Sequence, residues 1–194
     1  MKIDVAILAG GRSSRMGTDK AVLEVDGQTM IARVLEAARA VSERLFVVSN
    51  DAEKHAFLGV PIFSDEIKNV GPIGGIYTAL QHCHTSHCLV VACDLPFLNA
   101  PALQRLIEDC DGQLICAAKS ARGLEPLCAI YAKACLPFIE QSIIKKQLSL
   151  QVLFRELQTQ CVDLQDVPER TFLNVNTAAD LNKARERGMK TCKH

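Results

Sequence analysis

The segment Leu8-Ala9-Gly10-Gly11-Arg12-Ser13-Ser14-Arg15-Met16-Gly17 directly follows an apolar run at residues 3–8, a pattern that predicts a β-strand leading into a glycine-rich loop. Glycines let a backbone bend sharply and bring its N–H groups against phosphate oxygens, and Arg12, Arg15 and Lys20 can neutralise a triphosphate. The loop matches neither GxGxxG nor GxxxxGK[ST], so the dinucleotide and P-loop fingerprints do not apply. A surface loop with hydrated arginines is the alternative to a nucleotide-phosphate loop.

Beyond this loop, short Val- and Ile-rich runs alternate with longer helix-like segments, the pattern of βα units around a mostly parallel sheet. Strands are predicted at residues 3–8, 45–49, 60–64, 88–92, 114–118, 127–131 and 161–164, the last at a sheet edge. Helices are predicted at residues 30–41, 71–83 and 99–109, twice within 133–157, and at 177–187 from a capping box of Thr177 and Asp180. We expect an α/β, three-layer Rossmann-like fold with helices on both faces. It should form one domain over residues 1–194, with a loose tail after about residue 188.

The charge balance limits the classes of partner. Lys plus Arg and Asp plus Glu each number 22, and no run of like charges marks a basic arm or an acidic tail. This disfavours a nucleic-acid partner. The first apolar run is too short for a signal peptide, and no stretch of about 18 uncharged apolar residues occurs. We therefore expect no membrane association and a soluble, cytoplasmic protein.

The nine cysteines include no CxxC pair, and several lie in apolar runs, as Cys88, Cys116 and Cys128 do. We interpret them as reduced, buried small hydrophobic residues. Histidines and cysteines also crowd together at residues 82–88, where the usual zinc-finger spacing is absent. A helix end and the turn into a strand are therefore favoured there over a zinc site.

Two acidic residues, Asp65 and Asp94, each follow a Val- or Ile-rich strand. If those strands are parallel, both carboxylates lie at the same crevice beyond the sheet. Mg2+ prefers carboxylate oxygens together with substrate phosphate and water, so the pair suggests a magnesium site. Ordinary turn or cap residues are the alternative interpretation.

Several stretches, taken in order, resemble one known family over nearly the whole chain. They are Leu8-Ala9-Gly10-Gly11, Arg15-Met16-Gly17 with Asp19-Lys20, Gly71-Pro72-Ile73-Gly74-Gly75, Cys93-Asp94-Leu95-Pro96 and Asn174-Val175-Asn176-Thr177. In this order and spacing the chain resembles the molybdenum cofactor guanylyltransferases, whereas the first three alone would indicate only the wider nucleotidyltransferase superfamily. Cytidylyltransferases of that superfamily tend to carry Leu-Ala-Ala-Gly in the first stretch and a different triplet in the fourth, so the resemblance favours guanine.

The resemblance implies transfer of GMP from GTP to the phosphate of molybdopterin, with Mg2+, yielding molybdopterin guanine dinucleotide and pyrophosphate. By this resemblance, the guanine nucleotide is bound by Leu8, Ala9, Gly10 and Gly11, its phosphates by Lys20 and Arg15, and its nucleoside by Asp65. Asp94 would bind Mg2+. Asn174 and Asn176 would contact the pterin. The family also uses an Asn after its second strand. Asn50 is the candidate here, and Ser49 or Asp51 fits if the register slips by one.

One departure is Glu125-Pro126-Leu127, where other members often have His-Pro-Thr. Glu125 is either a second carboxylate near the site or a solvent-facing residue. Alternative activities are CTP use on the same pterin, GTP use on another phosphorylated acceptor, and a non-catalytic sensor or carrier of GTP or pterin. Proteins that deliver the pterin or belong to recipient molybdoenzymes are further candidate partners, and we expect a monomer or a weak homo-oligomer.

Overall fold

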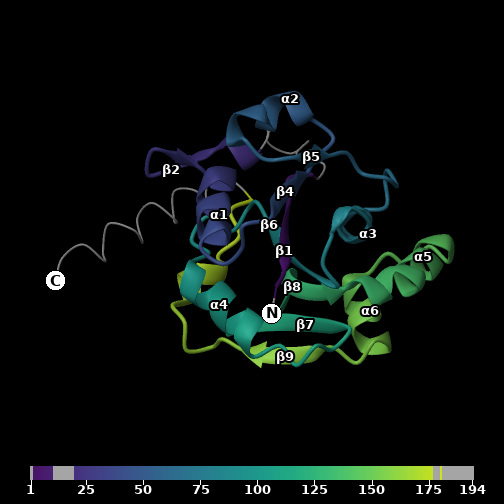
Figure 1. The fold of residues 1–194 in the computed structure, drawn as a ribbon. Coiled ribbons are helices and arrows are strands. Elements are labelled where there is room, and N and C mark those ends of the chain that lie inside the picture. Colours follow the sequence, from purple (N-terminus) through teal and green to yellow (C-terminus); the bar gives the residue numbers. More distant parts are fainter. Residues whose placement is uncertain (1, 11–19, 177–179, 181–194) are drawn as a thin grey trace.

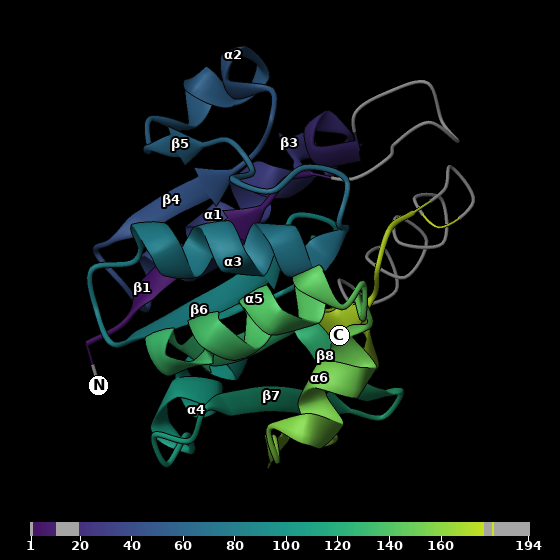
Figure 2. The same cartoon turned by 90° about the vertical axis from the view of Figure 1, so that its right-hand side faces the viewer.

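A computed structural model describes residues 2–10, 20–176 and 180 of the chain (Figures 1 and 2). Within these residues, seven strands form one sheet in the order β5-β4-β1-β6-β8-β7-β9. The strands are β1 (Asp4–Leu8), β4 (Leu45–Val48), β5 (Ile62–Phe63), β6 (His87–Ala92), β7 (Ile115–Ser120), β8 (Gly123–Ala132) and β9 (Gln160–Asp163). Only β8 runs against its neighbours β6 and β7 in this sheet. The predicted mostly parallel sheet is confirmed, as is the edge position of β9.

Helices cover both faces of this sheet (Figure 1). One face carries α1 (Met30–Arg39) and α4 (Ala100–Glu108), and the other carries α3 (Pro72–His82), α5 (Leu136–Ile144) and α6 (Leu150–Glu156). Shorter turns are α2 (Ala52–His55), η2 (Lys20–Val22), η3 (Ala56–Leu58), η4 (Lys133–Cys135) and η5 (Glu169–Phe172). The α/β, three-layer prediction is therefore correct.

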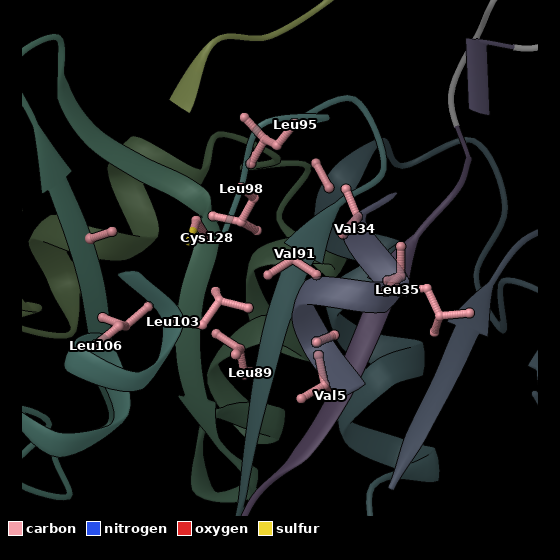
Figure 3. Close-up of a cluster of buried hydrophobic side chains, with 14 of the residues drawn as sticks. Val5, Val34, Leu35, Leu89, Val91, Leu95, Leu98, Leu103, Leu106 and Cys128 are labelled. Carbon is pink, nitrogen blue, oxygen red and sulfur yellow. The ribbon is translucent and has the colours of Figure 1, made fainter. Parts of the chain in front are cut away.

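Burial on both faces explains why the central strands are mostly apolar. Every residue of β1 is buried: Val5 and Ile7 pack into the core under α1 and α4, and Ala6 and Leu8 into the core under α3. Figure 3 shows the first core, where Val5 and Leu89 of the sheet lie close to side chains of α1 and α4. A central parallel strand has no solvent-facing side, so its sequence reads as a continuous apolar run.

The predicted start of the helix at residue 99 agrees with its capping group. The Asn99 side chain accepts a hydrogen bond from the Ala102 N–H at 3.0 Å, and Pro101 lies in the first turn of α4. Strand β8 begins four residues before its predicted start, because it forms a tight hairpin with β7 in which Ser120 pairs with Gly123. The polar Glu125 interrupts the apolar pattern there and conceals the strand.

A small hairpin after the glycine-rich loop was not predicted. It consists of β2 (Glu24–Val25) and β3 (Gln28–Thr29), paired antiparallel. Its turn residues Asp26 and Gly27 both have positive φ, 52° and 79°. An Asp-Gly pair with positive φ at both positions is the sequence signal of a two-residue hairpin, so this element was detectable.

The interpretation of the cysteines as uniformly reduced is wrong for Cys116, which forms a disulfide with Cys110 between α4 and β7. The short connection brings their Cα atoms to 5.8 Å, within bonding range. The apolar residues around a cysteine in the sequence indicate that it is buried, but they do not show whether a second cysteine lies close enough to bond with it. The disulfide was missed for this reason. Cys88 and Cys128 are free and buried, as predicted.

The segment at residues 82–88 is a helix end and a turn into a strand, as expected: His82 ends α3 and His87 begins β6. Among the described residues no group of three or more His, Cys, Asp or Glu side chains is arranged to hold a metal ion. A side-chain hydrogen bond with the buried Cys88 is the main cause that lowers the pKa of the Cys83 thiol to about 7. This pair lies at the amino end of β6, away from the strand ends that carry the predicted site.

Across the described ranges, no helix has both the length and the apolar character needed to cross a membrane. Of the predicted capping box, Thr177 lies outside the described residues. Asp180 is described, and its carboxylate accepts a hydrogen bond from the Asn176 N–H at 3.2 Å.

Candidate functional site

The candidate site lies where the parallel strands β5, β4, β1 and β6 end. Strand β1 pairs with β4 on one side and β6 on the other, and the chain visits these two sides through separate crossovers. The strand order therefore reverses at β1. At such a point a crevice opens beyond the carboxyl ends of the strands, and this is where open α/β sheets bind ligands. Gly10, Asn50, Asp65 and Asp94 follow these strand ends within a few residues, as predicted.

Asn50 and Asp65 are joined by two reciprocal hydrogen bonds. The Asn50 amide donates to Asp65 Oδ2 at 2.7 Å, and the Asp65 N–H donates to Asn50 Oδ1 at 3.1 Å. A Cβ atom built on Gly10 would lie 4.0 Å from the same Asp65 oxygen, so the end of β1 runs beside this pair. The ends of β5, β4 and β1 therefore lie side by side, with the Asn50–Asp65 pair next to Gly10.

The structure distinguishes Ser49, Asn50 and Asp51, the three candidates for the family's asparagine position after its second strand. Ser49 is buried, and its N–H donates to the carbonyl of Phe63 in the sheet. Asp51 caps α2 by accepting from the Lys54 N–H, and a separate hydrogen bond from the Lys54 side chain is the main cause that lowers the pKa of the Asp51 carboxyl. Asn50 is the residue among them whose side chain meets Asp65.

Asp94 lies in the turn after β6 and contacts a distant segment of the chain. The Val175 N–H donates to the carbonyl of Asp94 at 3.0 Å, and the Cys93 N–H donates to the carbonyl of Leu8 at 3.1 Å. Asn174 and Asn176 flank Val175, and they are half-buried and exposed, respectively. The structure thus brings Asp94, the end of β1 and the two predicted asparagines together.

The turn at residues 71–75 needs its glycines for close packing. Gly71 has φ 74° and ψ −157° at the N-cap of α3, a conformation that favours glycine. A Cβ atom on Gly74 would lie 2.8 Å from the carbonyl oxygen of Ile67, and one on Gly75 would lie 3.1 Å from Leu8 Cδ1. The absence of side chains lets α3 pack directly against the carboxyl end of β1.

Glu125 does not face solvent. Its side chain is 13% exposed, and its Oε1 atom accepts from Ser120 Oγ at 2.7 Å and from Arg122 Nη2 at 3.2 Å. Strand β8 extends past the pair that Val91 of β6 forms with Cys128, so Glu125 lies toward the same edge of the sheet as Asp94. Of the two alternatives for this carboxylate, the structure excludes a solvated one.

Part of the predicted site is not covered by the structure. Gly11, Arg12 and Arg15 lie outside the described residues. Lys20 begins η2, and its side chain also lies outside the described part of the chain. Their roles stay predictions.

Known proteins match both this sequence and this fold. The family model described as MobA-like NTP transferase domain matches residues 5–162. A probable molybdenum cofactor guanylyltransferase from Pelotomaculum thermopropionicum is 36% identical over 185 residues, covering 92% of this chain and 90% of that protein. Its counterpart from Carboxydothermus hydrogenoformans is 32% identical, covering 93% and 94%.

Solved structures agree. The crystal structure of molybdopterin-guanine dinucleotide biosynthesis protein A from Archaeoglobus fulgidus superimposes with a TM-score of 0.81 at 28% identity, covering 97% of this chain and all of that one. A protein from Aquifex aeolicus gives a TM-score of 0.81 at 32% identity, covering 91% and 94%. This chain belongs to the MobA-like NTP transferase family, together with the molybdenum cofactor guanylyltransferases.

Proposed function

We propose that this protein transfers GMP from GTP to the terminal phosphate of molybdopterin, forming molybdopterin guanine dinucleotide and releasing pyrophosphate. The names of its relatives support the substrates. The observation that carries the proposal is the hydrogen bond from Val175 to Asp94, because it brings the segment with Asn174 and Asn176 against the strand ends that carry Gly10, Asn50 and Asp65. Donor and acceptor would then meet at one edge of the sheet.

Each residue has a proposed role in this scheme. Backbone groups of Leu8, Ala9, Gly10 and Gly11 bind the guanine nucleotide, Asp65 held by Asn50 binds the nucleoside, Lys20 and Arg15 bind the phosphates, and Asn174 and Asn176 contact the pterin. The reciprocal hydrogen bonds between Asn50 and Asp65 support the nucleoside role, because they fix the direction of the Asp65 carboxylate. Recognition through fixed hydrogen-bonding groups gives a site its selectivity.

Asp94 is the proposed ligand of Mg2+, and the chemistry of the site suits that ion. The described residues contain no group of three or more metal-ligating side chains. Mg2+ is usually held by one or two carboxylates and completes its shell with phosphate oxygens and water, so it does not require such a cage. When bound, Mg2+ would neutralise charge on the phosphates.

The reaction needs no protein nucleophile. An oxygen of the acceptor phosphate attacks the α-phosphorus of GTP, the bond between that phosphorus and the bridging oxygen to the β-phosphate breaks, and pyrophosphate leaves. The chain's contribution is to align the two substrates and to stabilise the leaving charge through Lys20 and Arg15. A strand-end site suits this task, because rigid strands fix the residues that follow them.

We place this activity in the cytoplasm, because GTP, the proposed donor, is an intracellular nucleotide. Proteins that deliver molybdopterin or receive the dinucleotide are the proposed macromolecular partners. The proposed assembly is a monomer or a weak homo-oligomer.

Pyrophosphate release from GTP and, in parallel, from CTP tests the proposal, with molybdopterin and Mg2+ supplied to wild type and to Asp94→Ala. The matched control is Asp109→Ala, because Asp109 caps the far end of α4. Release from GTP that is lost in Asp94→Ala and kept in Asp109→Ala supports the assignment. Preference for CTP would overturn the base assignment, and nucleotide binding without release from either would favour a sensor or carrier.

A further inference from the structure

Arg33, the fourth residue of α1, connects two segments that are distant in the sequence. Its Nε–H donates to the carbonyl of Pro96 at 2.8 Å, and its Nη1–H donates to the carbonyl of Val25 at 3.3 Å. Its Nη1 also lies 3.8 Å from Asp26 Oδ2, and the guanidinium carbon is 5.7 Å from the centre of the Phe97 ring. Only 26% of the side chain is exposed. One guanidinium thus contacts both the β2–β3 hairpin and the turn that follows β6.

Both segments lead to the candidate site. Pro96 lies two residues after Asp94, and the hairpin that contains Val25 closely follows Lys20. Val25 is fully buried with Met30 and Val175, and Leu23, Phe97 and Leu173 pack around them. Because the Val175 N–H donates to the carbonyl of Asp94, the hairpin, the Asp94 turn and the segment of Asn174 and Asn176 meet around this small core.

The Asp94 turn needs support from outside the sheet. After β6 ends at Ala92, residues 93–97 form no helix or strand, and the bond from the Cys93 N–H to the carbonyl of Leu8 ties only the start of this segment to the sheet. A planar guanidinium can donate in two directions while it stacks on an aromatic ring, and a lysine ammonium cannot reproduce this arrangement. Displacing a reacting group by about 1 Å can cost about 100-fold in rate.

We infer that Arg33 is a positioning residue that clamps the Asp94 turn to the β2–β3 hairpin and thereby sets the Asp94 carboxylate relative to Asn174 and Asn176. The inference rests on the proposed function for its effect on turnover. The clamp itself predicts that Arg33 restricts the motion of the Asp94 turn, and this motion can be measured without any catalytic activity.

The test compares wild type with Arg33→Met and Arg33→Lys, and uses Arg39→Met as the matched control. Arg39 lies on the same helix, and its Nη2–H donates to the carbonyl of Leu58, away from the turn. We expect Arg33→Met to lower kcat by about 10- to 100-fold. The Mg2+ concentration for half-maximal rate should rise, with a smaller change in KM for GTP. Arg33→Lys should fall in between, and Arg39→Met should match wild type.

Hydrogen exchange supplies the readout that does not depend on activity. The N–H groups of Val175 and Leu98, which donate to Asp94 and Leu95, should exchange faster in Arg33→Met while those of β1 keep wild-type protection. Mn2+ binding in the presence of GTP, followed by electron paramagnetic resonance, should weaken in the same variant. If Arg33→Met unfolds, the same comparison in Arg33→Lys decides the question.

The outcomes separate the clamp from the proposed function. The clamp would be overturned if Arg33→Met folds and keeps the hydrogen-exchange rates, the Mn2+ affinity and the kcat of wild type. A wild type that never releases pyrophosphate from GTP would instead overturn the proposed function, and faster exchange at Val175 and Leu98 would then still support the clamp.

Discussion

Asn50 and Asp65 show how one side chain can orient another without contributing much to stability. Both hydrogen bonds between them are at an exposed position, so water can replace them when one partner is lost. The Asp65 carboxylate would then rotate freely. The pair should therefore matter more for binding than for folding.

We predict that Asn50→Ala lowers kcat/KM for GTP about tenfold, the loss of roughly one hydrogen bond to a charged group. The free energy of unfolding should change by less than about 1 kcal/mol. Steady-state kinetics and urea denaturation measure the two quantities. Asp51→Ala is the opposite case, because it removes the cap of α2 and should cost about 1 kcal/mol while leaving kcat/KM unchanged. An inverted pattern in the two variants would assign the role to Asp51.

Gly74 and Gly75 are neighbours in α3, and they differ in what a side chain would meet. We predict that Gly74→Ala destabilises the protein by about 1–3 kcal/mol, because its Cβ atom would lie 2.8 Å from the Ile67 carbonyl oxygen, which belongs to the backbone. In Gly75→Ala the contact is the flexible end of Leu8, and the gain in helix propensity of about 1 kcal/mol offsets part of the cost. Thermal unfolding of both variants checks the order, and equal losses would contradict it.

Among the elements, the apolar strands were predicted from their sequences, whereas two polar segments, the start of β8 and the β2–β3 hairpin, were missed. The runs at β1, β4 and β6 are buried on both faces, so their sequences alone reveal them. The start of β8 and the β2–β3 hairpin carry polar residues, because they lie at the rim of the sheet where the candidate site is. The same rule applies to the candidate site: Asp65 and Asp94 were singled out because they follow strand ends, whereas the contacts of Arg33 join distant segments that no local pattern encodes.

The disulfide between α4 and β7 is the second feature that depends on tertiary contact. Cys110 and Cys116 are six residues apart, and closing so short a loop reduces the conformational entropy of the unfolded state and raises its free energy by about 2 kcal/mol. We predict that Cys110→Ser lowers the free energy of unfolding by about that amount in oxidised protein. After reduction, wild type should fall to the same level. Cys161→Ser is the control, because Cys161 is free and exposed, and a loss in that variant comparable to Cys110→Ser would reject the explanation.

On the scale of the whole molecule, the sheet edge and the segments around Asp94 form one unit, so nucleotide binding should stabilise the entire fold. Strands β4, β1 and β6 are hydrogen-bonded to one another, and Asn50, Gly10 and Asp94 follow their ends. A ligand that contacts all three ends cannot stay bound once the sheet separates. It therefore binds the native state alone, which is the condition for stabilisation by mass action.

We predict that GTP with Mg2+ at about 100 times its Kd raises the free energy of unfolding by about 2.7 kcal/mol. For a chain of this size, that corresponds to a rise in Tm of about 5–11 °C. CTP at the same concentration should give a smaller shift, because guanine is the proposed base. Differential scanning calorimetry measures both shifts in Tm.

The two site variants should change this shift in different ways. Asp94→Ala should lose the part of the GTP-induced Tm shift that requires Mg2+. Asn50→Ala should lower the Tm shift at fixed GTP concentration with or without Mg2+. If Asp94→Ala and wild type show the same Mg2+-dependent shift, the metal is held by other groups, and the proposed role of Asp94 is wrong even if the base preference stands.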